Sequence, residues 1–153
     1  MAHNKKRNTM TDQNSDEAQL HRKYAVDLFN LTWDLLDKVD RTQEEADEMI
    51  HAAHASRYHW AQVGSALELE RGEWQISRVY ATVGRAEPAL YHAQRCLQIC
   101  RENEIADFDI VFAHEAMARA YAVAGDPDQS RGCLALGNAA VDNIADAGDK
   151  AYA

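Results

Sequence analysis

The chain has 153 residues, of which 46% are hydrophobic and 27% charged, so it fits one globular domain and neither a fibrous nor a wholly disordered class. Its 7 Gly and 2 Pro are too few for the many tight turns of a β-sandwich or barrel. The formal net charge of -9 argues against a nucleic-acid partner, because phosphate binding needs clustered Lys and Arg. We therefore expect an all-α protein.

The two ends of the chain are polar, and the start carries a short basic run, Lys5-Lys6-Arg7. No apolar stretch near the start resembles a secretory signal or a membrane span. We expect disordered tails at residues 1–15 and 148–153, around a single helical-repeat domain at residues 16–147. These features predict a cytoplasmic protein with no membrane partner.

Three cysteines, Cys96, Cys100 and Cys133, match no metal-finger spacing. An odd set of thiols fits reduced side chains in a cytosolic helical core better than a disulfide framework. Cys96 and Cys100 lie four residues apart on one helical face, and we expect them to be small core residues.

The first two predicted helices occupy residues 16–38 and the segment after Thr42. Thr42 and Glu45 have the spacing of a capping box, in which each side chain accepts a hydrogen bond from a free backbone N–H. The apolar stripe of the first helix is Leu20, Tyr24, Leu28, Leu31 and Leu35. The stripe of the second is Ala46, Ile50, Ala53, Arg57, Trp60 and Ala61.

The next two helices are separated by Gly84, where a left-handed cap has little steric cost, and the later one begins near Pro88. The third helix, residues 66–83, carries Leu69, Ile76, Val79, Tyr80 and Val83 on one side. The fourth is expected to bury Ala89, Ala93, Cys96, Leu97 and Cys100.

The last two helices are divided by Gly125, with Asp126 and Pro127 opening the sixth. The fifth helix, residues 107–124, has the apolar stripe Ile110, Ala113, Met117, Ala118 and Tyr121. Short connections favour antiparallel neighbours, so three helix hairpins are predicted. Residues 79–84 and 120–125 also form an internal repeat, with Gly84 and Gly125 placed 41 residues apart.

The segment 80–90, followed by Cys96-Leu97, resembles a tetratricopeptide repeat. In that family a Tyr ends the first helix, a Gly turns the chain, an Ala opens the second helix, and a small residue followed by Leu closes it. A less faithful copy consists of Ala118, Tyr121, Gly125 and Ser130. The departures are Ser77 in place of Gly or Ala, Ala93 in place of a larger aromatic, and a period longer than the standard one.

The resemblance covers residues 66–147 and implies a right-handed superhelix of three stacked antiparallel helix hairpins. Residues 71–76 are also similar to small bacterial proteins of this type. In such folds the first helix of each pair lines a concave groove. The side chains expected on that wall are Arg71, Trp74 and Arg78 from the third helix and Phe112, Glu115 and Arg119 from the fifth.

An arginine guanidinium matches a carboxylate or phosphate with two parallel hydrogen bonds, so three arginines in one groove predict an anionic ligand. We expect an adaptor or regulatory module that binds a protein, an acidic peptide or a small anion and needs no cofactor. The alternative is an ordinary solvated surface, with Glu115 pairing Arg119, Glu73 pairing Arg78, and Trp74 serving only for packing.

A second alternative is a helical metalloprotein or enzyme. Asp47, His51 and His54 share one stripe of the second helix, and His114 on the fifth could complete a site. A di-iron bundle needs two E-x-x-H motifs, and only Glu48 with His51 has that spacing. The simpler interpretation makes His51, His54 and His59 half-buried packing residues on the side of the second helix that faces the third.

Neither a nucleophile elbow nor a glycine-rich phosphate loop is present, so no catalytic residue is predicted. Self-assembly is open as well, since the sixth helix lacks a polar outer face and a second subunit of a homodimer could cover it.

Overall fold

The computed structural model describes residues 3–144, with side chains from residue 14 onward. Within that range the chain forms six α-helices and no strand, which confirms the all-α class. They are α1 (His3–Leu36), α2 (Gln43–Val63), α3 (Ala66–Thr82), α4 (Ala86–Glu102), α5 (Asp107–Val123) and α6 (Pro127–Val141). The predicted disorder of residues 148–153 lies outside the described residues.

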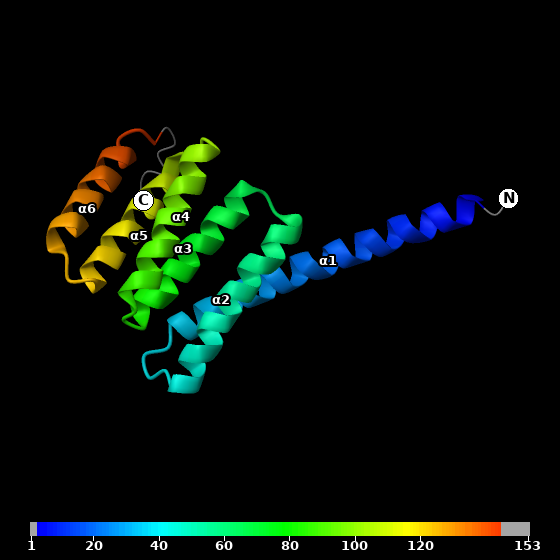
Figure 1. Ribbon diagram of the computed structural model, residues 1–153, viewed down its shortest axis with the longest axis horizontal. Helices are drawn as coiled ribbons and strands as arrows, with labels where there is room; N and C mark the ends of the chain where they lie inside the picture. Colours follow the sequence, from blue (N-terminus) through cyan, green and yellow to red (C-terminus); the bar gives the residue numbers. More distant parts are fainter. Residues whose placement is uncertain (1–2, 145–153) are drawn as a thin grey trace.

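The helices pack as consecutive antiparallel pairs, α1 with α2, α3 with α4, and α5 with α6 (Figure 1). Contacts between pairs join α2 to α3, α4 to α5, α3 to α5 and, less extensively, α1 to α3. The first helices of the three pairs are therefore neighbours in the order α1, α3, α5, which brings their side chains to one shared surface.

Capping residues set the helix starts. Thr42 Oγ1 accepts a hydrogen bond from Glu45 N at 3.2 Å and Glu45 Oε2 accepts one from Thr42 N at 3.0 Å, so the predicted capping box is confirmed. A second box, between Ser65 and Glu68, starts α3. Asp126 Oδ1 accepts from Gln129 N at 3.0 Å and caps α6.

The turn after α3 and the turn after α5 share one geometry. Gly84 and Gly125 have φ angles of 73° and 77°, the left-handed region that side chains disfavour. In each turn the next residue donates back to a tyrosine carbonyl, Arg85 N to Tyr80 O at 2.9 Å and Asp126 N to Tyr121 O at 2.9 Å. The repeated Tyr-to-Gly spacing therefore corresponds to a repeated helix ending.

We expect Gly84→Ala to lower the free energy of unfolding by about 1–2 kcal/mol, because the new Cβ forces a left-handed conformation. Gly132→Ala, inside α6 with open space around the glycine, should instead raise it by about 0.5–1 kcal/mol. Urea unfolding of both variants measures this difference. Equal changes in the free energy of unfolding would mean that the backbone conformation of the glycine does not determine the effect of the substitution.

Helix α1 begins at His3, so residues 3–15 differ from the expected disordered tail. The first 36 residues contain neither Gly nor Pro, and nothing in them interrupts a helix. The first part of α1 projects beyond the other helices (Figure 1). Its predicted stripe is correspondingly divided, since Leu20 and Tyr24 are 51% and 47% exposed while Leu35 is 5% exposed.

Two apolar clusters form the core. One joins α1, α2 and α3 around Leu35, Met49, Ala53, Ile76 and Val79. The other joins α3 to α6 and consists largely of small side chains, including the predicted residues Ala89, Ala93, Cys96, Cys100 and Cys133. All three cysteines are free and buried, as predicted. Met49 is fully buried although it does not belong to the predicted stripe of the second helix. The buried face of α2 is therefore rotated by one residue relative to the prediction.

Leu134 and Leu136 on α6 are about half exposed, at 46% and 55%. The homodimer that would cover this surface stays a prediction. No helix in the described range combines the length and the apolar character needed to cross a membrane.

Candidate binding groove

A hollow of about 380 Å³ opens where α1, α3 and α5 meet. A second hollow, of about 290 Å³, adjoins it and extends toward α2. The first is lined by Phe29, Trp33, Glu70, Arg71, Trp74, Phe108, Asp109 and Phe112. The second is lined by Val26, Phe29, Trp60, Glu68 and Arg71. Because the two share Phe29 and Arg71, we treat them as one surface and call it the groove.

A continuous row of five aromatic rings crosses the groove from α1 through α3 to α5. Successive ring centroids lie 6.2 Å (Phe29 to Trp33), 5.5 Å (Trp33 to Trp74), 5.6 Å (Trp74 to Phe112) and 6.0 Å (Phe112 to Phe108) apart. These spacings are typical of aromatic pairs that attract each other. The row is an apolar floor wide enough for several side chains of a ligand.

The spacing along each helix explains the row. Phe29 and Trp33 are four residues apart, as are Phe108 and Phe112, so each pair lies on one side of its helix. Trp74 of α3 lies between the pairs and contacts both. Packing of α3 between α1 and α5 thus joins two local pairs into one surface.

Arg71 lies on the groove wall but is already paired. Its Nε and Nη2 donate to the two carboxylate oxygens of Asp109 at 2.8 and 3.1 Å, and its guanidinium carbon lies 5.2 Å from the ring centroid of Phe108. The hydrogen bond to Asp109 raises the pKa of Arg71. The prediction of Arg71 as a free anion-binding fork is therefore corrected, because Asp109 occupies the fork.

The two other predicted arginines differ from each other. Arg119 pairs with Glu115 within α5, as the alternative interpretation expected, and burial lowers its pKa. The guanidinium of Arg78 lies 5.4 Å from the ring centroid of Trp33 at the edge of the groove. Among the described residues no carboxylate forms an ion pair with Arg78. Arg78 is thus the candidate arginine whose charge is open to a ligand.

Two polar groups are held in the groove wall. Glu70 is 1% exposed, and burial raises its pKa to about 7. Its Oε2 and the indole Nε1 of Trp74 find no hydrogen-bond partner among the described residues. Buried polar groups without partners are uncommon and costly, so both atoms mark a place where a ligand could contribute.

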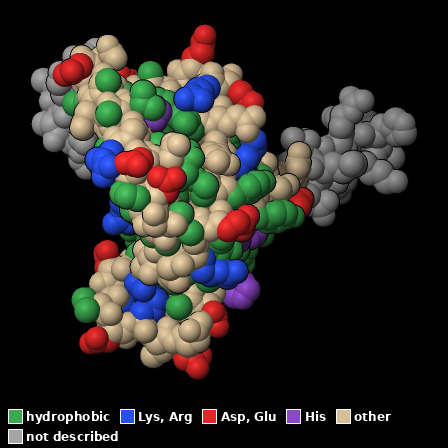
Figure 2. Space-filling model, turned by 60° about the vertical axis from the view of Figure 1, so that its left-hand side comes forward, with side chains coloured by type: hydrophobic (Ala, Val, Ile, Leu, Met, Phe, Trp, Pro, Cys, Tyr) green, Lys and Arg blue, Asp and Glu red, His purple; other side chains and the backbone are tan. Residues whose placement is uncertain are grey.

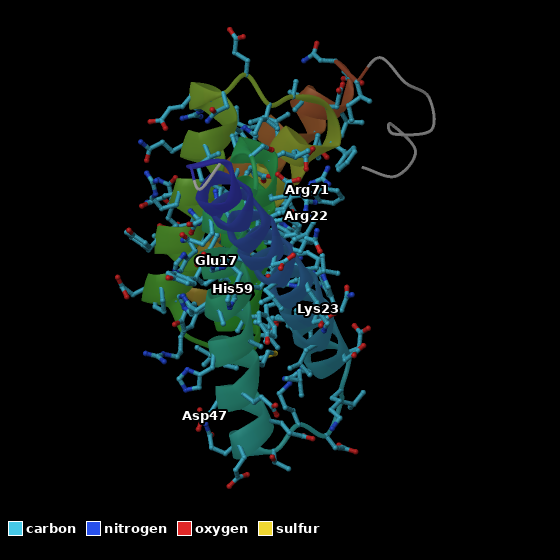
Figure 3. The ribbon with its side chains drawn as sticks, turned by 90° about the vertical axis from the view of Figure 1, so that its right-hand side faces the viewer. Glu17, Arg22, Lys23, Asp47, His59 and Arg71 are labelled. Carbon is cyan, nitrogen blue, oxygen red and sulfur yellow. The ribbon has the colours of Figure 1, made fainter. Side chains whose placement is uncertain are left out.

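The structure thus brings Arg71, Trp74 and Phe112 to the groove, with Arg78 at its edge. Five further lining residues were not predicted from the sequence: Phe29, Trp33, Glu70, Phe108 and Asp109. The four-residue spacing within the two aromatic pairs, Phe29 with Trp33 and Phe108 with Phe112, was a usable signal for these residues. No local sequence pattern, however, indicates that α1 packs beside α3. Figure 3 shows that the labelled Arg22 of α1 and Arg71 of α3 lie on the same side of α1.

The four metal candidates predicted from the sequence do not converge. Asp47, His51 and His54 are exposed on α2, whereas His114 is buried on α5 beside Gly137 of α6. His54 Nε2 instead lies 3.0 Å from Tyr80 Oη, and partial desolvation of the imidazole ring there lowers the pKa of His54 although much of the residue is exposed. The helical period places Asp47, His51 and His54 on one side of α2, but it carries no information on whether His114 of α5 lies close enough to act as a fourth ligand.

The remaining histidines pack against neighbours. His59 lies on α2 (Figure 3), and its Nδ1 is 2.9 Å from Nδ1 of His21 on α1 rather than against α3. His92 Nδ1 lies 2.6 Å from Glu73 Oε2, which requires the ring proton on Nδ1. Arg57 Nε donates to the other oxygen of Glu73 at 3.0 Å. Glu73 therefore pairs across helices and not with Arg78.

Charges elsewhere are intermixed. Figure 2 shows Lys and Arg side chains interspersed with Asp, Glu and apolar ones, without a patch of one sign on that face. The groove is thus set apart by its aromatic floor and by Arg78.

No protein-family model matches the chain, and neither a curated protein nor a solved structure matches it.

Proposed function

We propose that this chain is a tetratricopeptide-like adaptor or regulatory module that binds a peptide in the groove. In this proposal its three antiparallel hairpins form a right-handed superhelix. The repeated helix ending at Gly84 and Gly125 supports the repeat, as does the adjacency of α1, α3 and α5.

The observation that carries the proposal is the aromatic row across three helices beside an open hollow. Aromatic side chains supply large contact areas and are among the residues that dominate binding energy. The apolar side chains of a peptide would lie on Trp33, Trp74 and Phe112. The two joined hollows run from α5 to Trp60 of α2, and this extent suits an extended segment better than a compact small molecule.

An acidic group of the peptide would pair with Arg78. The guanidinium is held against Trp33, so its position is fixed before the ligand arrives and less conformational entropy is lost on binding. Arg71 and Arg119 already have carboxylate partners and contribute mainly by holding the walls in place. The proposal therefore concerns a peptide with apolar residues and an acidic residue near one end.

The test uses Arg78→Glu in a capture experiment from cell lysate, with bound proteins identified and their peptides re-tested in isolation. Loss of a hydrogen-bonded charge pair costs about 1.5–3 kcal/mol, so affinity for such a peptide should fall about 10- to 150-fold. Intrinsic fluorescence reports binding directly, because Trp33 and Trp74 lie in the groove.

The matched control is Arg131→Glu on α6, where the arginine side chain is 69% exposed and pairs with Asp128 one turn away on the same helix. Its capture should equal that of the wild type, and circular dichroism should be unchanged in both variants. Equal binding by wild type and Arg78→Glu would contradict the proposal.

A further inference from the structure

Beneath the groove wall, one carboxyl and two thiols from different helices come together. Cys96 and Cys100 lie one turn apart on α4 and face Glu70 of α3. One ligand atom from each residue lies within 4.8 Å of the other two, and all three residues are buried. Cys96 Sγ donates a hydrogen bond to Glu70 Oε1 at 2.9 Å. Within the described range this is the one group of three such side chains close enough to hold a metal ion.

The cluster is costly if packing is its only role. Among the residues that the structure describes, no cation pairs with Glu70, and the guanidinium of neighbouring Arg71 is bound to Asp109. Its Oε2 finds no hydrogen bond in the described part of the chain although the side chain is 1% exposed. A buried polar group without a partner costs about 1–3 kcal/mol, and an apolar side chain of similar size would avoid that cost. A bound ion would supply the missing partner.

We propose that Glu70, Cys96 and Cys100 bind a thiophilic divalent metal ion, with Zn²⁺ the best fit. Thiolates favour Zn²⁺ over Mg²⁺ or Ca²⁺, and a carboxylate is an accepted third ligand. Donors bound to one Zn²⁺ at about 2.0–2.3 Å lie less than about 4.6 Å apart, so small side-chain adjustments suffice. Two thiolates and one carboxylate leave a fourth coordination position, as in open zinc sites.

The groove provides the way in. Glu70 belongs both to the cluster and to the lining of the larger hollow, so an ion can reach the thiols past its carboxyl. This inference is independent of the proposed peptide binding, because Arg78 contacts Trp33 and not the cluster. Arg78→Glu should therefore bind the ion like the wild type, which separates failure of either idea from failure of the other.

The test is titration of the reduced, chelator-treated full chain with Co²⁺, whose thiolate complexes show charge-transfer absorption in the near ultraviolet. We expect saturation at one equivalent, loss of the band when Zn²⁺ is added, and a rise in Tm of about 5–10 °C at a hundredfold excess of free Zn²⁺ over Kd. A folded wild type without the band and without the rise in Tm would overturn the proposal. So would a Co²⁺ spectrum without thiolate absorption, which would place the ion on histidines.

Variants assign the ligands. Cys96→Ser and Cys100→Ser should each weaken Co²⁺ affinity and reduce the charge-transfer band to about half or less, since one thiolate remains, and Glu70→Gln should weaken Co²⁺ affinity at least about tenfold. Cys133→Ser removes a buried thiol outside the cluster and should bind like the wild type. If a cysteine variant loses its helical circular dichroism, the proposal is judged from the Co²⁺ titrations of the wild type and of Glu70→Gln alone. An equal response from Cys133→Ser and Glu70→Gln would overturn the assignment.

Discussion

Replacing Glu73 with Gln is expected to lower the free energy of unfolding by about 3 kcal/mol, at the lower end of the range for breaking a buried ion pair. The Glu73 side chain is 9% exposed and joins Arg57 of α2 to His92 of α4. Once the charge of Glu73 is removed, Arg57 remains half-buried without a carboxylate partner. The polar contact that joins α2, α3 and α4 is weakened as a result. Urea unfolding and the Tm, which should fall by about 6–12 °C, measure the loss.

The matched control is Glu115→Gln, which also removes one carboxylate from an arginine. The Glu115 and Arg119 side chains are 31% and 30% exposed, so water compensates for the broken pair and about 1 kcal/mol or less is expected. If both variants lose the same free energy, burial of Glu73 does not set the strength of its pairing.

The same carboxyl makes stability depend on pH. Burial acts to raise the pKa of Glu73, but the hydrogen bond with His92 and the charge of Arg57 outweigh it, and the pKa is lowered from 4.5. A carboxyl whose pKa is lowered on folding stabilises the protein fully above its unfolded pKa and loses that contribution as the pH falls through its folded value. Acid unfolding that begins below about pH 4.5 should therefore be shallower in Glu73→Gln than in the wild type.

Local chemistry predicted most of the helix boundaries. Capping boxes and left-handed glycines act over three or four residues, so Thr42, Gly84, Gly125 and Asp126 marked helix ends correctly. The Ser65 and Glu68 pair obeys the same rule and marks the start of α3. The start of α1 was missed because polar composition suggested disorder, whereas the structure continues a helix that nothing interrupts.

The groove was harder to predict because its decisive contacts are not local. Trp74 and Phe112, which the helical period predicted for the groove wall, line the larger hollow, but Phe29 and Trp33 reach it only because α1 packs beside α3. The Arg71 to Asp109 pair spans 38 residues, a distance at which spacing rules say nothing. Glu115 with Arg119 lies within the i,i+4 rule, and that pair was anticipated.

Close packing of α3 against α4 leads to the second large effect. Ser77 is 1% exposed, and its Oγ donates to the Ala89 carbonyl at 2.8 Å, with Ala89 and Ala93 of α4 both 0% exposed. No room remains for a longer side chain, which explains why a small residue stands at this position of α3. Ser77→Leu should therefore lower the free energy of unfolding by about 3–4 kcal/mol, from overpacking and the lost hydrogen bond together.

A short series separates these two causes. Ser77→Ala loses only the hydrogen bond and should cost about 1 kcal/mol, whereas Thr82→Leu, exposed in the last turn of α3, should stay within about 0.5 kcal/mol of the wild type. Urea unfolding gives all three values. A Leu variant no less stable than the Ala variant would show that α3 and α4 can move apart freely. Because Trp74 lies less than one turn from Ser77, its fluorescence would then report whether the aromatic row moves with α3.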